Sequence, residues 1–63
     1  MERNSRKLLG KLQQDGWQVV RIRGDHHILQ HPDFAHSIVV PHPKKDLPFG
    51  LVRKIYKDAG WLP

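Results

Sequence analysis

Histidine is the side chain in this 63-residue chain that can transfer protons near neutral pH, and the chain has five histidines. An imidazole group ordinarily titrates near pH ~6.5, so it can act as a general acid or base. His26 follows the turn-forming pair Gly24-Asp25, and Arg21 and Arg23 precede it closely. Cleavage of RNA by its own 2′-hydroxyl needs such a base or acid, together with cations that stabilise the phosphorane. His26 is therefore a candidate catalytic residue, but a turn histidine more often has a structural role, and this run alone leaves both roles open.

The spacing of the histidines argues against a metal site. His26 and His27 are adjacent on a predicted strand and point to opposite faces, while His27 and His31 share a face roughly 13 Å apart at ~3.3 Å per residue. His31 and His36 could pair across a second hairpin, but two ligands are too few for a closed zinc site. The chain has no cysteine, which excludes disulfides and thiolate zinc sites. We therefore expect neither a metal nor a cofactor.

A second candidate site is the run Pro41-His42-Pro43-Lys44-Lys45. The prolines restrict the backbone, and Lys44 and Lys45 project into solvent, where lysines contact phosphates. The structural alternative is a solvated charge pair in a connector. Trp17 and Trp61 could stack on bases, but tryptophans more often pack against a core or a helix end.

The charge of the chain favours a polyanionic partner. Eleven Lys and Arg against six Asp and Glu give a net charge of +5, and small basic domains typically bind nucleic acid or an acidic protein. Residues 1–63 form one domain with no room for a deep substrate cavity. No apolar run reaches the ~20 residues that span a membrane, and the polar N-terminus lacks a signal-peptide pattern. We expect a cytoplasmic protein that does not bind membranes.

Hydrophobic periodicity predicts the elements that must position these residues. A first helix is expected over residues 4–15, capped by Asn4 or Ser5, and strands are expected over residues 17–22, 26–31 and 36–40. A second helix is expected to begin near Pro48, with Asp46 as its candidate N-cap, and to end at Gly60. Its buried stripe consists of apolar residues at helical spacing: Leu51, Val52, Ile55 and Ala59.

This element order predicts an α+β fold in which two helices cover one face of a three-stranded antiparallel sheet. A two-residue turn at Gly24-Asp25 predicts three pairs across the first hairpin: Arg23 with His26, Arg21 with Ile28, and Val20 with Leu29. Alternation then assigns four residues to the helix-covered face: Val20, Ile22, His27 and Leu29. Five residues are assigned to the open face: Arg21, Arg23, His26, Ile28 and Gln30.

Two groups of residues resemble one protein family closely. The first comprises Gly16-Trp17-Gln18-Val19-Val20-Arg21, Gly24-Asp25-His26-His27 and His31-Pro32. The second comprises Pro41-His42-Pro43-Lys44-Lys45-Asp46-Leu47-Pro48 and the helical segment that follows it, residues 51–60. The chain resembles HicA-type toxins, the mRNA interferase half of HicA/HicB toxin–antitoxin pairs, over roughly residues 4–60.

The resemblance implies properties that periodicity does not show. It implies a fold like the double-stranded-RNA-binding domain and ribosome-independent cleavage of mRNA. The family's essential histidine falls on His26, and the glycine of the same motif falls on Gly24. The resemblance also implies a HicB-like antitoxin that blocks the active face and, through its own DNA-binding part, represses the operon.

The resulting hypothesis is a toxin of a type II system that cleaves mRNA without metal. His26 would act as general base or acid, the four cations Arg21, Arg23, Lys44 and Lys45 would bind RNA phosphates, and Gly24 would turn the backbone beside the substrate. One alternative is a non-catalytic RNA-binding module on the same fold. Another is an interaction protein whose basic face only docks an acidic partner.

Overall fold

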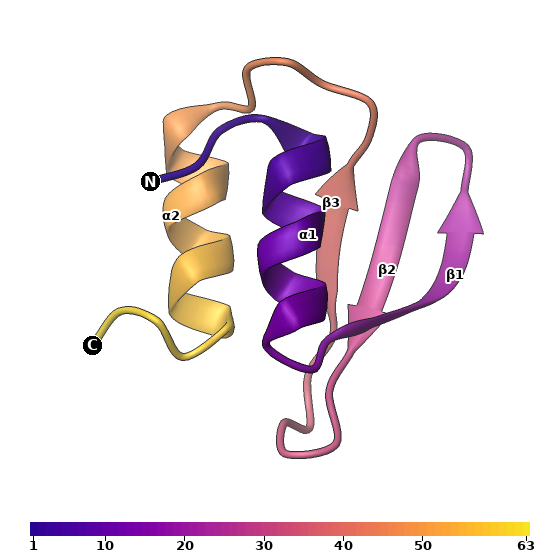
Figure 1. Ribbon diagram of the computed structural model, residues 1–63, viewed down its shortest axis with the longest axis vertical. Helices are drawn as coiled ribbons and strands as arrows, with labels where there is room; N and C mark the ends of the chain where they lie inside the picture. Colours follow the sequence, from indigo (N-terminus) through magenta and orange to yellow (C-terminus); the bar gives the residue numbers. More distant parts are fainter.

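The computed structural model describes residues 1–63 and contains two helices and three strands (Figure 1). Along the chain these are α1 (Ser5–Gln14), β1 (Gln18–Arg23), β2 (His26–Gln30), β3 (Ile38–Pro41) and α2 (Phe49–Asp58). The strands form one antiparallel sheet in the order β1-β2-β3. The predicted α+β fold is confirmed, and the arrangement is consistent with a double-stranded-RNA-binding-domain-like fold.

Both helices pack on the same face of the sheet. They contact β3, and the β1–β2 hairpin extends to one side of them (Figure 1). The core between the layers is formed by fully or almost fully buried apolar residues: Leu8, Leu9, Leu12, Trp17, Leu29, Ile38, Val40, Leu47, Val52, Ile55 and Ala59. Neither helix has the length and apolar character needed to cross a lipid bilayer.

The starts of the two helices differ in how they are capped. Asn4 caps α1, because its side chain accepts a hydrogen bond from the Lys7 N–H at 3.2 Å. The prediction that Asp46 caps α2 is wrong, since the N-cap is Pro48 and makes no side-chain cap bond. Asp46 instead lies 3.2 Å from Arg3 Nε, where it ties the connector before α2 to the N-terminal segment. The neighbouring Leu47 is fully buried, so this connector is anchored at both of these residues.

The predicted register of the first hairpin is wrong at one position. Arg23 pairs with His26 as expected, but Val19 rather than Val20 pairs with Leu29. Val20 is the extra residue of a β-bulge and is 53% exposed. The bulge reverses the alternation of β1, since an unpaired residue shifts the side chains that follow it to the other face. Because of it, one strand packs Val19 against the core and still places Arg21 on the open face.

The expectation that Ile22 belongs to the core is also wrong. Ile22 pairs with His27 and so faces the helix-covered side, yet it is 58% exposed. β1 is the edge strand farthest from β3, and the helices contact the sheet at β3. The alternation therefore identifies the face of Ile22, and the lateral position of β1 leaves that face uncovered.

Candidate functional site

The open face of the β1–β2 hairpin carries the histidine and arginines that the sequence singles out. Arg23 lies directly opposite His26, and Arg21 lies opposite Ile28 on the same face. All three charged or titratable side chains are exposed, and that of His26 is 58% exposed. Asp25 Oδ1 lies 3.7 Å from His26 Nε2, a surface contact longer than a hydrogen bond. The imidazole of His26 is therefore accessible to a large, flexible anion without opening of the fold.

Gly24 forms the tight turn beside His26. Its φ of +58° lies in the left-handed region that residues with a Cβ adopt at a cost. A Cβ at this position would meet no atom within 4 Å, so the space around the turn is open. The tight turn predicted at Gly24 is present, and the space beside it is accessible from solvent.

His27 points to the other side of the sheet from His26. It is half-buried, and its ring packs edge-on against that of His42, with ring centroids 4.9 Å apart and an interplanar angle of 85°. Its Nδ1 is buried and has no hydrogen-bond partner. His27 thus supports the hairpin from the helix-covered face, in contrast to its exposed neighbour.

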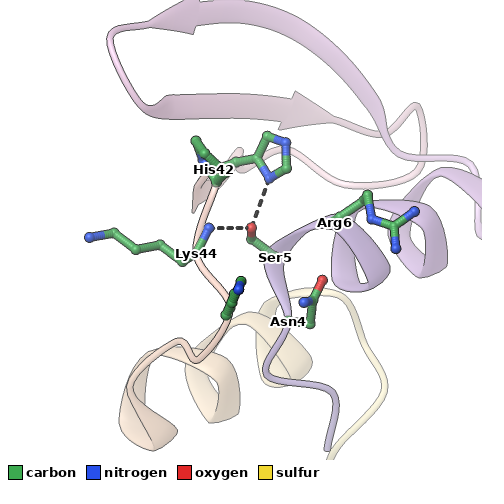
Figure 2. A pocket seen from close by; sticks show the side chains of 7 residues that line it. Asn4, Ser5, Arg6, His42 and Lys44 are labelled. Carbon is green, nitrogen blue, oxygen red and sulfur yellow. Dashed lines mark hydrogen bonds between the residues drawn. The ribbon is translucent and has the colours of Figure 1, made fainter.

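Lys44 and Lys45 do not lie on the open face. They line a separate pocket between the loop after β3 and the start of α1, together with Asn4, Ser5, Arg6, His42 and Pro43 (Figure 2). Two backbone hydrogen-bonding groups of Lys44 hold the loop to α1: its N–H donates to Ser5 Oγ at 2.8 Å, and its carbonyl accepts from the Ser5 N–H at 2.9 Å. The structure thus divides the predicted site residues into a hairpin group and a pocket group.

One backbone hydrogen bond connects the two groups. The His42 N–H donates to the Asp25 carbonyl at 2.7 Å, so the pocket loop continues the sheet ladder beside the turn that carries His26. His26 pairs with Pro41, the residue just before His42. The hairpin group and the pocket group therefore lie at the same end of the sheet, with their side chains on opposite faces of it.

The remaining histidines and tryptophans have structural contacts. His31 Nε2 lies 2.9 Å from the Asp15 carbonyl, and His36 Nε2 lies 2.7 Å from the Asp58 carbonyl. Trp17 is fully buried, and Trp61 donates from Nε1 to Asp15 Oδ2 at 2.9 Å. The expectation that both tryptophans pack against the core or a helix end is confirmed.

Sequence reasoning missed Ser5 and Arg6 as members of a site. Ser5 was expected only as a possible helix cap, and it is 1% exposed with its hydroxyl 2.7 Å from His42 Nδ1. It lies 37 positions from His42, so no local pattern joins the two. The available signal was the Pro-His-Pro run, whose restricted backbone indicates a loop held in one conformation.

Comparison with known protein families matches the sequence of this chain to one of them. The family of HicA toxins of bacterial toxin–antitoxin systems matches residues 5–61, which includes the hairpin, the pocket loop and both helices. None of the curated proteins matches the chain. Since the family match spans nearly all of the 63 residues, the chain belongs to the HicA toxin family of bacterial toxin–antitoxin systems.

Proposed function

We propose that this toxin is a metal-independent endoribonuclease that cleaves mRNA, with His26 as its catalytic residue. The observation that carries the proposal is the exposed His26 imidazole directly across the strand pair from Arg23, with Arg21 on the same open face. An exposed and flat site suits a polymer substrate better than a small molecule, which needs a concave pocket.

The chemistry follows from what RNA and these side chains each supply. The 2′-hydroxyl oxygen attacks the adjacent phosphorus, the bond to the 5′-oxygen breaks, and a cyclic phosphate and a free 5′-hydroxyl result. His26 accepts the 2′-hydroxyl proton as base or donates a proton to the leaving oxygen as acid, and water serves in the other role. Arg21 and Arg23 stabilise the charge that develops on the phosphoryl oxygens. Because the substrate brings the nucleophile and the arginines bring the cations, the scheme requires no metal.

The partners follow from family membership and charge. A toxin of a toxin–antitoxin system has an antitoxin, and a HicB-like protein that covers the open face of the hairpin would block access to His26. A net charge of +5 favours both RNA and an acidic antitoxin surface. In this proposal the toxin acts on mRNA in the cytoplasm and reaches operator DNA only through its antitoxin.

The test is inducible expression in bacteria of the wild type, His26→Ala and the control Gln30→Ala, followed by growth and mRNA integrity. Gln30 is exposed and belongs to the same hairpin. Only His26→Ala should lose growth arrest and RNA fragmentation, while the melting temperatures stay equal. Purified wild type should cleave RNA in excess EDTA. Loss of cleavage in EDTA, or full activity of His26→Ala, would overturn the proposal.

A non-catalytic RNA-binding module is the second candidate, and the cations favour it. Arg21 and Arg23 form no ion pair within the protein and could hold RNA without any reaction at His26. This candidate predicts that wild type and His26→Ala bind RNA equally and that neither fragments it. A third candidate, docking of an acidic protein only, predicts weak RNA binding by both.

A further inference from the structure

The pocket beside Ser5 is the largest concave feature of the molecule, with a volume of about 480 Å³. Most of the surface that lines it is carbon, contributed by side chains that carry polar groups, and three of its seven residues are cations: Arg6, Lys44 and Lys45. Figure 2 shows the Arg6 and Lys44 side chains extending to opposite sides of Ser5. A group bound in the pocket would thus have positive charge on both sides.

These cations have no carboxylate partners. The ion pairs of the protein join Arg3 to Asp46 and Lys54 to Asp58, and neither includes a cation of the pocket. The two acidic side chains nearest in sequence are already engaged, because Asp46 is paired with Arg3 and Glu2 accepts the Asn4 N–H at 3.0 Å. The pocket is therefore a site of uncompensated positive charge, which suits an anion.

The Ser5 hydroxyl contacts the His42 imidazole, which can supply a further hydrogen-bond donor. Ser5 Oγ accepts from the Lys44 N–H, and its one other polar neighbour is His42 Nδ1 at 2.7 Å. When the hydroxyl donates to Nδ1, the proton of a neutral ring lies on Nε2. In that tautomer Nε2 carries a hydrogen that no hydrogen bond within the protein uses, so it can donate to an anionic oxygen.

The start of α1 is not itself the binding element. The Ser5 N–H donates to the Lys44 carbonyl and the Lys7 N–H to Asn4 Oδ1, so these amides of the first turn are already occupied. The groups of the pocket that remain available to an anion are side chains: the Arg6 guanidinium, the two lysines and His42.

We propose that this pocket binds a phosphodiester of the RNA strand close to the one that is cleaved at His26. The inference rests on the proposed function and adds a second phosphate subsite to it. The His42 N–H bond to the Asp25 carbonyl places the pocket beside the catalytic turn, on the opposite face of the sheet. The RNA backbone bends around this end of the sheet, past the open space at Gly24. A strand bent in this way is single-stranded, which makes unpaired mRNA the preferred substrate.

The binding test uses a 2′-O-methyl RNA oligonucleotide, which lacks the nucleophile and cannot be cleaved. Its affinity is measured against salt concentration for Arg6→Gln and Lys44→Gln, and for the matched controls Arg53→Gln and Lys57→Gln on α2. Each pocket variant should lower the slope of log affinity against log salt by about 1, the effect of losing one phosphate contact. The α2 controls should keep the wild-type slope, and equal slopes for both sets would overturn the proposal.

The donor role of His42 is tested by two isosteres. His42→Asn keeps an acceptor near the Nδ1 position for Ser5 and removes the Nε2–H, whereas His42→Gln keeps a donor near the Nε2 position. His42→Asn should fold with the wild-type melting temperature and raise KM for RNA with kcat unchanged, and His42→Gln should retain more affinity if it folds. Wild-type KM in a folded His42→Asn would overturn the donor role.

The subsite and the catalytic proposal fail in different ways. If the wild type binds RNA through the pocket but never cleaves it, the nuclease proposal is refuted and the subsite proposal is retained. If the wild type cleaves RNA and its KM equals the KM of Arg6→Gln and of Lys44→Gln, the subsite proposal is refuted and the nuclease proposal is retained. A neutral methylphosphonate, placed at one position of the oligonucleotide at a time, locates the contact. At the position that occupies the pocket, it should lower the RNA affinity of the wild type and leave the RNA affinity of Lys44→Gln unchanged.

Discussion

At the scale of single residues, two adjacent histidines have opposite environments. His26 is exposed on the open face, while His27 is half-buried and its buried Nδ1 makes no hydrogen bond. The cause is the alternation of side chains along β2. The same rule places His42 on the helix-covered face, beside His27 and within reach of Ser5. One histidine is thus exposed to solvent, and the other two pack against each other on the opposite face of the sheet.

Ser5→Ala should destabilise the fold. The substitution removes an oxygen that bonds His42 Nδ1 and the Lys44 N–H, and it leaves both groups without a partner. The expected loss is about 1–3 kcal/mol of unfolding free energy, measured by urea denaturation. Ser37→Ala is the control, because its hydroxyl makes only an exposed contact of 3.4 Å with Gln30. Equal stability of the two variants would show that the Ser5 contacts contribute nothing.

Gly24→Ala and Gly16→Ala should differ in stability. Both glycines have positive φ, which costs an alanine roughly 1–2 kcal/mol. At Gly16 the new Cβ would also lie 2.7 Å from His31 Nε2 and displace the contact of that ring with the Asp15 carbonyl, whereas the space at Gly24 is open. Gly16→Ala should therefore lower the melting temperature more. The reverse order in thermal unfolding would contradict this account.

At the scale of elements, β1 combines two tasks that a regular strand could not perform. The bulge at Val20 allows Val19 to contact the core while Arg21 and Arg23 face outward. β1 is also the edge strand away from β3, and two of its three apolar residues, Val20 and Ile22, stay exposed.

Ile22→Thr and Ile38→Thr should therefore have different effects, even though both side chains face the helix-covered side. Ile22 is largely exposed, so the substitution should change the unfolding free energy by less than about 0.5 kcal/mol. Ile38 is buried in β3, where lost apolar contact and a buried hydroxyl should cost roughly 2–4 kcal/mol. Threonine keeps the β-branched shape at both sites. A large loss for Ile22→Thr in urea denaturation would show that the hairpin is covered in solution.

At the scale of the whole molecule, a thin core carries a strongly basic surface. A domain of this length rarely gains more than about 3–5 kcal/mol from its core. The chain has no disulfide and a net charge of +5, so self-repulsion reduces that margin further. A bound antitoxin would stabilise the fold by mass action.

Leu12→Ala should unfold most of the free protein. Leu12 is fully buried, and truncation of such a residue costs about 2–5 kcal/mol, which is comparable to the whole stability. Circular dichroism at room temperature should show loss of helix, and growth arrest should disappear on expression. Gln13→Ala, an exposed neighbour on α1, should remain folded. A cooperative melting transition of Leu12→Ala close to that of wild type would contradict the marginal-core account.

The element order, the antiparallel sheet and the open-face set around His26 were all predictable from the sequence. Each depends on local rules: helical spacing of leucines, turn formation at Gly24-Asp25, and alternation along a strand. The family resemblance likewise followed from motifs that are contiguous in the chain, and it was confirmed.

Only the tertiary structure decided three features, and each depends on contacts between residues far apart in the chain. The bulge at Val20 lets Val19 face the core and Arg21 face the open side of the sheet, and no local rule predicts at which residue it forms. The exposure of Ile22 depends on how far the helices reach across the sheet. The pocket joins Ser5 to His42 across 37 positions, so its donor and its cations become one site only when α1 packs against the loop after β3. Local patterns in a chain this small specify elements and faces, whereas the packing of one element on another creates the concave site.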